Sequence, residues 1–223
     1  MNYVLCILMS YAIGCINPAY IIGKIKGMDI REKGSRNAGG SNALILFGKV
    51  MGILCMLLDI GKSCLAIWLS GILFPEMSFI YSIAGCACIL GHMFPFYMGF
   101  RGGKGTASLG GMVLMLDWRI FLIFLAVEIV IVLITDYLCF MPITAVIIFP
   151  ILYGVYKQDL WGAVIILSVT AAVLYKNIEN IKRMLNGTEV HFSFLWNKDK
   201  EINRVTGGDE TDMFDSKKGD ENE

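Results

Sequence analysis

Residues 79–105 read FIYSIAGCACILGHMFPFYMGFRGGKG, an apolar run that ends in a glycine-rich loop with two cations. A helix needs about 17–25 apolar residues to cross a hydrocarbon core about 30 Å thick, and Phe79–Tyr97 meets that length. Glycine lets a backbone approach a ligand closely and turn successive N–H groups toward it. With the charges of Arg101 and Lys104, the stretch predicts a membrane helix that leads into an anion site for a phosphate-bearing substrate.

The whole chain shares this apolar character, since 56% of its 223 residues are hydrophobic and only 17% are charged. We therefore expect an all-α integral membrane protein with about seven transmembrane helices, at Tyr3–Ile25, Gly52–Phe74, Phe79–Tyr97, Thr106–Leu116, Arg119–Thr135, Tyr137–Tyr156 and Leu160–Tyr175. The fourth is short for a bilayer and needs tilt, local thinning or shielding by its neighbours. The first has no basic residue before its apolar run, so we interpret it as a retained helix, not a signal peptide.

Basic residues gather in the connections on one side of these segments. Short cytoplasmic loops carry the Lys/Arg excess of a membrane protein. One side holds Lys24, Lys26, Arg31, Lys33, Arg36, Lys49, Arg101, Lys104, Lys176, Lys182 and Arg183, and the other holds Arg119 and Lys157. This predicts a multi-pass protein of the bacterial cell (inner or plasma) membrane, with the N-terminus outside and with the C-terminus and all glycine-rich basic loops in the cytoplasm.

The remaining composition predicts two regions and no bound metal or cofactor. Residues 1–196 form the expected transmembrane domain, whereas 197–223, with nine acidic and five basic residues, are expected to be a disordered cytoplasmic tail. Only two histidines are present, His92 and His191. Neither Gly61-Lys62-Ser63 nor Gly103-Lys104-Gly105 has the spacing of a nucleotide-binding P-loop. The seven cysteines adjoin apolar helices and are interpreted as buried free thiols: Cys6, Cys15, Cys55, Cys64, Cys86, Cys88 and Cys139.

Three polar segments are predicted on the cytoplasmic face. They are DIREKGSRNAGGSN at 29–42, the glycine-rich loop at 91–105, and NIENIKRMLNGTE at 177–189, in which Asn180, Arg183 and Gly187 are spaced to share a helix face. Each offers small hydrogen-bonding residues beside cations. For one loop alone, turn chemistry and anchoring to anionic lipid is the better interpretation. Three loops on one face favour a binding site for an anionic, water-soluble substrate.

A few polar residues fall inside the apolar segments. Asp59 and Lys62, one turn apart, are interpreted either as a functional intramembrane pair or as a solvated structural pair near the interface. Glu128 is isolated in its segment, so we expect it to face the bundle interior or to mark a bound polar group. His92 is interpreted either as a packing residue at a helix end or as part of the site.

The polar segments and their flanks resemble one known family in order and spacing. The matching stretches are GCINPAYIIGK at 14–24, DIR at 29–31, GSRN at 34–37 with Asn42, LD at 58–59 with Lys62, GHMFP at 91–95, GGKG at 102–105, NIKR at 180–183 and GTE at 187–189. Over about residues 3–190 they resemble the bacterial acyl-phosphate:glycerol-3-phosphate acyltransferases of the PlsY type.

The resemblance implies a seven-helix membrane enzyme of phospholipid biosynthesis. Its reaction transfers a fatty acyl group from acyl phosphate to the 1-hydroxyl of glycerol 3-phosphate, giving lysophosphatidic acid and phosphate. Ser35, Lys104 and Asn180 are then expected to be catalytic, and Glu189 is expected to brace the loops. Substrate contacts are expected from Asn37, Asn42, Arg101, Gly102, Gly103, Gly105, Asn177 and Arg183. No Ser-His-Asp arrangement is visible, so direct attack by the glycerol hydroxyl is favoured over an acyl-enzyme.

The chain departs from the family pattern at three places. The family usually has His at Asn177, Arg at Ile45, and an Arg-Tyr-x-Ser pattern where this chain has Asp136-Tyr137-Leu138-Cys139. Each change removes a candidate phosphate ligand or base, and Asp136 adds a repelling charge. Losing one charge-assisted hydrogen bond costs about 1.5–3 kcal/mol, or roughly tenfold or more in binding.

These departures keep one other function open, and the seven apolar segments with interior polar residues permit a second. One is a lipid- or phosphate-binding membrane homologue without turnover, and the other is a small-solute permease, against which we note no evident internal repeat or pair of broken helices. The expected partners are acyl phosphate, glycerol 3-phosphate and membrane lipid. No nucleic acid is expected, and the sequence identifies no protein partner.

Overall fold

The computed structural model describes residues 2–197, 200–201 and 204, and over these residues the chain is helical with no strands. The α-helices are α1 (Asn2–Cys15), α2 (Pro18–Ile25), α3 (Gly40–Phe47), α4 (Lys49–Leu73), α5 (Ile80–Met93), α6 (Thr106–Leu116), α7 (Trp118–Thr135), α8 (Phe140–Lys157), α9 (Leu160–Leu167) and α10 (Thr170–Leu185). Two 3₁₀ turns, η1 (Phe96–Met98) and η2 (Phe192–Leu195), complete the described part. The predicted all-α fold class is confirmed.

Six stretches of the described chain are long and apolar enough to cross a membrane. They are Asn2–Ile25, Lys49–Leu73, Ile80–Met98, Trp118–Thr135, Phe140–Lys157 and Leu160–Leu185. Helix α6 is also apolar but has only 11 residues. Six of the predicted segments thus have counterparts of spanning length, whereas the count of seven depends on α6 and stays a prediction.

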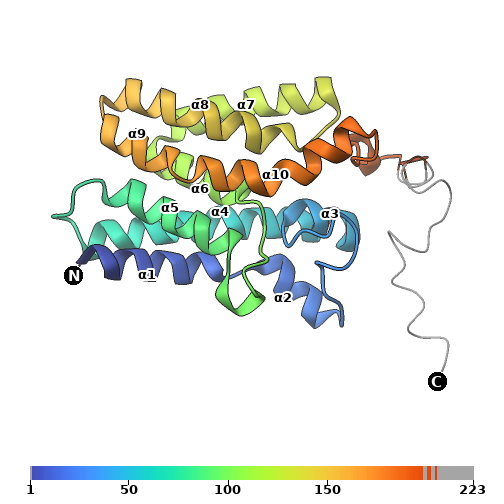
Figure 1. Ribbon diagram of the computed structural model, residues 1–223, viewed down its shortest axis with the longest axis horizontal. Helices are drawn as coiled ribbons and strands as arrows, with labels where there is room; N and C mark the ends of the chain where they lie inside the picture. Colours follow the sequence, from blue (N-terminus) through green and yellow to red (C-terminus); the bar gives the residue numbers. More distant parts are fainter. Residues whose placement is uncertain (1, 198–199, 202–203, 205–223) are drawn as a thin grey trace.

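The helices form two layers (Figure 1). Helices α1, α4 and α5 pack together in one layer, and α7, α8, α9 and α10 make the other. The short α6 contacts α4 and α5 on one side and α7 and α8 on the other. A helix too short to span alone is therefore shielded by its neighbours, as its length required.

Glycines let α1 and α5 cross with their backbones in contact. A Cβ added to Gly14 would lie 2.1 Å from the carbonyl oxygen of Cys88, and one added to Gly91 would lie 2.2 Å from that of Tyr11. Small residues at a crossing allow this close approach, which membrane helices use because lipid offers no hydrophobic drive for helix association. The crossing positions the end of α5, from which the glycine-rich loop departs.

Two of the spanning stretches each consist of two α-helices with a break between them, and neither break was predicted. Between α1 and α2, Asn17 has extended backbone angles (φ −115°, ψ 99°) because it precedes Pro18, and it caps α2 by accepting the N–H of Tyr20 at 2.8 Å. Between α9 and α10, the chain is interrupted at Ser168–Val169. The expectation of no pair of broken helices was therefore wrong.

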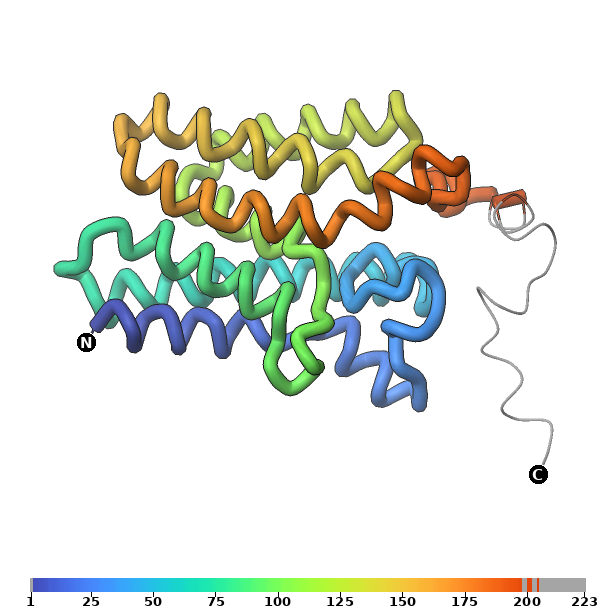
Figure 2. Tube along the Cα trace, viewed as in Figure 1, coloured from blue at the N-terminus to red at the C-terminus, as the bar shows by residue number. Residues whose placement is uncertain are grey.

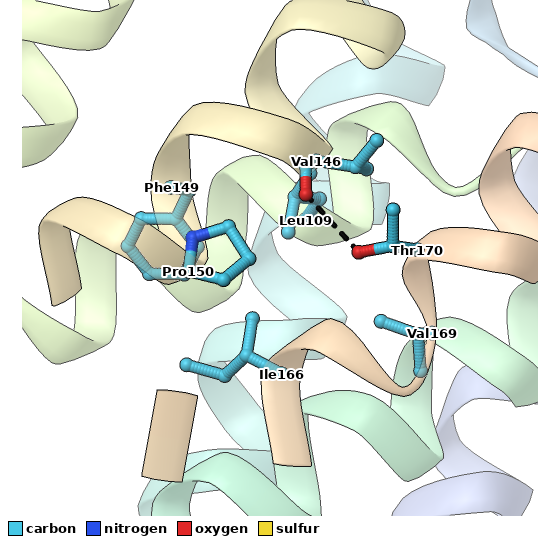
Figure 3. A pocket seen from close by; sticks show the side chains of 7 residues that line it. All are labelled: Leu109, Val146, Phe149, Pro150, Ile166, Val169 and Thr170. Carbon is cyan, nitrogen blue, oxygen red and sulfur yellow. Dashed lines mark hydrogen bonds between the residues drawn. The ribbon is translucent and has the colours of Figure 1, made fainter. Parts of the chain in front are cut away.

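The second break is matched by a proline in the neighbouring helix. Pro150 lies inside α8 and has no N–H to donate to the carbonyl of Val146, four residues earlier. Thr170, at the start of α10, donates its hydroxyl to that carbonyl at 3.1 Å, as Figure 3 shows. A backbone acceptor inside the apolar region is thus satisfied by a side chain of another helix.

The isolated polar groups also have defined places. Glu128 is buried in α7 and accepts the Thr144 hydroxyl at 2.5 Å, so it faces the bundle interior, as one of the two alternatives held. All seven cysteines are free, as expected, and only Cys64 is partly exposed.

Most of the predicted tail lies outside the described residues. Two described members are held in place, since Glu201 accepts the N–H of His191 at 2.7 Å and Arg204 donates to the Glu189 carbonyl at 2.5 Å.

The first connection lies toward one end of the molecule, and the loop after α5 projects nearer the middle of its length (Figure 2). The first connection leads into α3, a helix that was not predicted and that packs on α4. The C-terminal end of α10 lies at the same end of the bundle. The loop after α5 is fastened to the first break, because the Tyr97 hydroxyl donates to the Cys15 carbonyl at 2.8 Å and that of Tyr11 donates to the Phe94 carbonyl at 2.7 Å.

Candidate active site

A polar network joins the glycine-rich loop to the end of α10. The Lys104 ammonium donates to the amide oxygen of Asn180, and the Asn180 amide donates to a Glu189 oxygen at 2.8 Å. Arg183 donates to the other Glu189 oxygen and to the Asn180 oxygen, both at 2.7 Å. The network holds two cations and one carboxylate, so it keeps an excess of positive charge beside the loop.

The local turn after α10 brings Glu189 back to Asn180. Helix α10 ends at Leu185, and Gly187 adopts a left-handed conformation (φ 69°) that glycine reaches without strain. The N–H of Glu189 then returns to the Arg183 carbonyl at 3.1 Å. The predicted shared face of Asn180 and Arg183 is confirmed by their direct hydrogen bond, whereas Gly187 lies beyond the helix and provides the turn.

The glycines of the 102–105 loop have a different task from the one expected. The N–H of Gly102 donates to the Met93 carbonyl and that of Gly103 to the His92 carbonyl, both at 3.1 Å. These two amides are therefore engaged within the protein and are not turned toward a ligand. Their lack of a side chain is needed for packing, because a Cβ on Gly103 would lie 2.0 Å from the His92 ring and one on Gly102 2.2 Å from the His92 carbonyl. Gly105 (φ 87°) then turns the chain into α6.

Burial sets the electrostatic state of Lys104. Removal from water disfavours the charged ammonium and lowers the pKa of Lys104 to about 8. The nearby Arg183 also lowers this pKa, whereas the Glu189 carboxylate raises it. The side chain remains partly exposed. Such a lysine is charged at neutral pH and is poorly solvated, which strengthens its interaction with an anion.

The first connection is organised by Asn42. This residue is fully buried on α3, its amide oxygen accepts the N–H of Ser35 at 2.8 Å, and its amide nitrogen donates to the carbonyls of Ile30 at 2.8 Å and Lys33 at 3.0 Å. All of its hydrogen-bonding groups thus serve the loop, which differs from the expected substrate contact. Ser35 and Asn37 are half-buried on the loop that Asn42 shapes.

The first connection and the glycine-rich loop touch. The carbonyl oxygen of Ala38 lies 2.8 Å from where a Cβ of Gly103 would be. Asn37, which precedes Ala38, and Lys104, which follows Gly103, are therefore attached to adjoining stretches of backbone. Arg31 adds a second link, since it donates to the Met98 carbonyl at 2.6 Å and pairs with Asp29 at 2.7 Å. Hydrogen bonds from Arg31 lower the pKa of Asp29, so the pair is ionised at neutral pH. This role of Arg31 was not predicted, although the DIR motif at 29–31 was its signal in the sequence.

Two predicted contacts lie outside the network. Asn177, one turn before Asn180, is fully buried and donates to the Val173 carbonyl at 2.8 Å, while its amide oxygen has no hydrogen-bond partner among the described residues. Arg101 is exposed on the loop. Neither is joined by a hydrogen bond to the Lys104 network in the described part of the chain, and their predicted substrate contacts stay predictions.

Two of the remaining departures from the family pattern, Ile45 and Asp136, contact a C-terminal segment. Ile45 is buried with Leu44 against Phe194 of η2. The Asp136 carboxylate accepts hydrogen bonds from Ser193, so the charge expected to repel substrate is bound to protein donors. Cys139 is a buried free thiol.

Comparison with known proteins gives one consistent result. A model of the glycerol-3-phosphate acyltransferase family matches residues 4–187. Glycerol-3-phosphate acyltransferase 1 of Oceanobacillus iheyensis is 38% identical over 205 residues, which cover 89% of this chain and 99% of the relative. The chain belongs to the glycerol-3-phosphate acyltransferase family.

Further members agree in sequence and in three dimensions. The glycerol-3-phosphate acyltransferase of Clostridioides difficile is 36% identical, over 84% of this chain and 94% of its own. The crystal structure of PlsY, an integral membrane glycerol 3-phosphate acyltransferase, in its glycerol 3-phosphate form is 32% identical, with a TM-score of 0.78 over 87% of this chain and 98% of that one. Its lysophosphatidic acid form gives a TM-score of 0.74.

The predicted PlsY-type family is thereby confirmed, as is the integral membrane acyltransferase that it implies. As a glycerol-3-phosphate acyltransferase, this protein carries its polar network at the end of a membrane-embedded helix bundle. A permease is not supported, despite the two broken helices.

Proposed function

We propose that this acyltransferase moves a fatty acyl group from acyl phosphate to the 1-hydroxyl of glycerol 3-phosphate and releases lysophosphatidic acid and phosphate. The observation that carries the proposal is the network of Lys104, Asn180, Arg183 and Glu189, which holds an excess cation beside loops at the end of an apolar bundle. The glycerol 3-phosphate and lysophosphatidic acid forms of the similar PlsY support the same acceptor and product.

Lys104 is assigned as the main charged contact to phosphate. Its ammonium is partly desolvated, and α6 begins two residues later, so the positive end of the helix dipole lies on the same side. Asn180 orients the ammonium by accepting its hydrogen bond, Arg183 donates to the same Asn180 oxygen, and Glu189 holds both residues. Ser35 and Asn37 are assigned to contacts with the reacting groups. Their loop reaches the site because the Ala38 carbonyl lies against Gly103, the residue before Lys104.

The chemistry needs no covalent enzyme intermediate. The glycerol hydroxyl attacks the carbonyl carbon of the mixed anhydride, the bond from that carbon to the phosphate oxygen breaks, and the departing phosphate takes up the hydroxyl proton. An anhydride is already activated, so positioning and stabilisation of negative charge by Lys104 are the contributions required of the protein. The acyl chain of the donor remains in the apolar surroundings of the bilayer.

We assign the site to the cytoplasmic face of a bacterial cell membrane. Lys24 lies in the last turn of α2, Lys26 and Arg36 lie between α2 and α3, Lys104 lies just before α6, and Arg183 lies in the last turn of α10. A positive-inside distribution supports this orientation. Labelling single cysteines introduced at Lys26 and at Lys157 in spheroplasts tests it, because the proposal requires an impermeant reagent to reach only position 157.

The reaction is tested with purified protein in lipid nanodiscs, palmitoyl phosphate and labelled glycerol 3-phosphate. Lysophosphatidic acid is expected, and Lys104→Ala is expected to lose about a hundredfold or more of the activity because a desolvated charge contact disappears. Lys49→Ala, which removes an exposed cation at the start of α4, serves as the matched control and is expected to keep full activity.

Other outcomes separate the remaining functions. Product formation from acyl-CoA but not from acyl phosphate would overturn the assigned donor. Stabilisation of the protein by glycerol 3-phosphate without any product would identify a binding protein that has lost turnover. Equal loss in Lys104→Ala and Lys49→Ala would overturn the role given to Lys104.

A further inference from the structure

Three ionisable side chains meet in the interior of the bundle, outside the network just described. The Lys62 ammonium lies 2.6 Å from an Asp59 oxygen and 2.8 Å from Nδ1 of His92, and that nitrogen lies 3.2 Å from the same Asp59 oxygen. Asp59 and Lys62 come from α4 and His92 comes from the last turn of α5. Their exposed fractions are 1%, 7% and 3%, so the cluster is closed to water.

One arm of this cluster reaches the break between α1 and α2. Lys62 donates to the carbonyl of Ile16 at 2.7 Å. In a continuous helix this carbonyl would accept the N–H of Tyr20, but that N–H is bound by the side chain of Asn17 instead. Lys62 therefore satisfies an acceptor that the break leaves open. The amide of Asn17 in turn donates to the Ala38 carbonyl at 2.8 Å and fastens the loop of Ser35 and Asn37.

The other arm reaches the residue before Lys104. The His92 carbonyl accepts the N–H of Gly103, and Nε2 of the ring would lie 2.0 Å from a Cβ on that glycine. The ring edge thus presses on the Gly103 backbone. An ammonium has only donors, so Nδ1 is the acceptor in the contact with Lys62. The ion pair of Asp59 and Lys62 therefore holds the ring in its orientation beside Gly103.

The cost of the cluster argues for a task beyond stability. A buried ion pair loses most of its Coulomb energy to desolvation, and apolar residues of similar volume often stabilise as well or better. Charged groups inside membrane segments are costly and typically serve function. The two arms end at Ala38 and Gly103, which are in contact, and each of these residues lies within three positions of a predicted catalytic residue.

We propose that Asp59, Lys62 and His92 form a positioning triad, which locks the Gly103 backbone and the Ala38 carbonyl against each other and thereby aims Lys104 at the acceptor phosphate. The inference rests on the proposed role of Lys104 as the phosphate contact. None of the three residues touches substrate. The triad acts through the backbone, so its loss is expected to weaken glycerol 3-phosphate recognition more than donor recognition.

The variants are chosen to separate the parts of the triad. His92→Phe keeps a ring against Gly103 but removes the acceptor for Lys62, and His92→Asn keeps an acceptor near Nδ1 but removes the ring edge. Asp59→Asn with Lys62→Met removes both charges together and leaves no unpaired ion. Glu128→Gln is the matched control, because it alters a buried carboxyl group bound to Thr144, away from these arms.

The first readout is the KM for each substrate. Each triad variant is expected to raise the KM for glycerol 3-phosphate about tenfold, equivalent to about 1.4 kcal/mol, with a change of less than twofold in the KM for acyl phosphate. Glu128→Gln is expected to leave the ratio of the two KM values unchanged. A triad variant that changes thermal stability but not this ratio would reduce the cluster to a structural element and overturn the proposal.

The second readout does not depend on activity. Amide hydrogen exchange in nanodiscs is expected to speed up in residues 99–105 of every triad variant, because the backbone carbonyl of residue 92, which accepts the Gly103 N–H, is held in place less firmly. Exchange there is expected to stay unchanged in Glu128→Gln. Unchanged exchange in a folded triad variant would overturn the proposal. If the wild type formed no lysophosphatidic acid, the proposed function would fail, and this exchange measurement would still decide whether the triad fixes the loop.

Discussion

Asp136 accepts two hydrogen bonds from Ser193, one from its backbone N–H and one from its hydroxyl, each 2.7 Å long. The backbone carbonyl of Asp136 also accepts the N–H of Phe192 at 2.6 Å. Because Asp136 follows α7 and Ser193 lies in η2, these contacts fasten the C-terminal segment to the second helix layer. The next residue, Phe194, packs on Leu44 and Ile45 of α3. The segment thus bridges the two layers at the end that carries the site.

Removing the Phe194 ring is expected to release this bridge. Phe194→Ala loses the burial of an aromatic side chain and is expected to lower the free energy of unfolding by about 1.5–3 kcal/mol. Trp196→Ala, which removes an exposed ring of the same segment, is the control and is expected to change it by less than about 0.5 kcal/mol. Denaturation of both variants in detergent measures the difference. Equal stability of the two would show that the contact with Ile45 contributes nothing.

The lowered pKa of Lys104 predicts a pH limit for acceptor binding. The ammonium binds phosphate, and in the free protein its protonated fraction falls as pH rises through about 8, so the KM for glycerol 3-phosphate is expected to increase about tenfold per pH unit above that value. A fully exposed lysine would hold its charge to about pH 10. Bound phosphate stabilises the charged ammonium. A saturating concentration of glycerol 3-phosphate is therefore expected to move this limit to higher pH.

Two variants check the assignment of this titration. Lys104→Arg keeps a charge at all these pH values, and its KM is expected to stay flat between pH 7 and about pH 10, whatever its absolute value. Glu189→Gln removes the carboxylate that raises the pKa of Lys104, so the limit is expected to move to lower pH. A pH profile identical in Lys104→Arg and the wild type would assign the titration to another group.

Gly103 is expected to tolerate no side chain. Gly103→Ala would put a Cβ 2.0 Å from Nε2 of His92 and 2.8 Å from the Ala38 carbonyl, and the second contact is with backbone, which cannot rotate away. The loop must shift, so kcat/KM for glycerol 3-phosphate is expected to fall about a hundredfold. Gly110→Ala, where the nearest atom is 3.7 Å from the added Cβ, is the control with near-normal activity. A kinetically normal Gly103→Ala would contradict the described packing of the loop.

The sequence supports the fold well where length and apolarity decide it. The run of Lys49–Leu73 has no alternative to a spanning helix, and its predicted counterpart differs by only a few residues at each end. The break at Asn17 was missed although Asn-Pro is its local signal, because the apolar pattern continues across it. The break after Leu167 has no proline or glycine to mark it, and it depends on packing against α8.

The sequence predicted which residues form the site, but not the role of each one. Asn180, Arg183 and Glu189 lie within ten positions, so local spacing brings them together, and Lys104 was chosen for its charge. The Gly103 N–H is bound by a carbonyl in α5, and the hydrogen-bonding groups of Asn42 are all bound by the loop that folds around it. Such pairings are set by tertiary structure. The predicted roles of Ser35 and Asn37 remain predictions until substrate is bound.

The bond between Thr170 and Val146 offers a test of how the second broken helix is stabilised. Thr170→Val removes the donor and leaves the Val146 carbonyl without a partner in apolar surroundings, which is expected to cost about 1–3 kcal/mol of unfolding free energy. Ser168→Ala is the control in the same break, because its hydroxyl is exposed and bonds within its own turn at 2.6 Å.

A second substitution shows whether Pro150 is the reason for this bond. In Pro150→Ala, the new N–H can reach the Val146 carbonyl within α8, so the carbonyl no longer needs Thr170. Thr170→Val is then expected to cost less in the Pro150→Ala background than in the wild type, with a coupling of about 0.5–3 kcal/mol in a double-mutant cycle. Additive costs would mean that the threonine stabilises the break independently of the proline. Coupled costs would identify α8 and α10 as helices whose irregularities compensate each other.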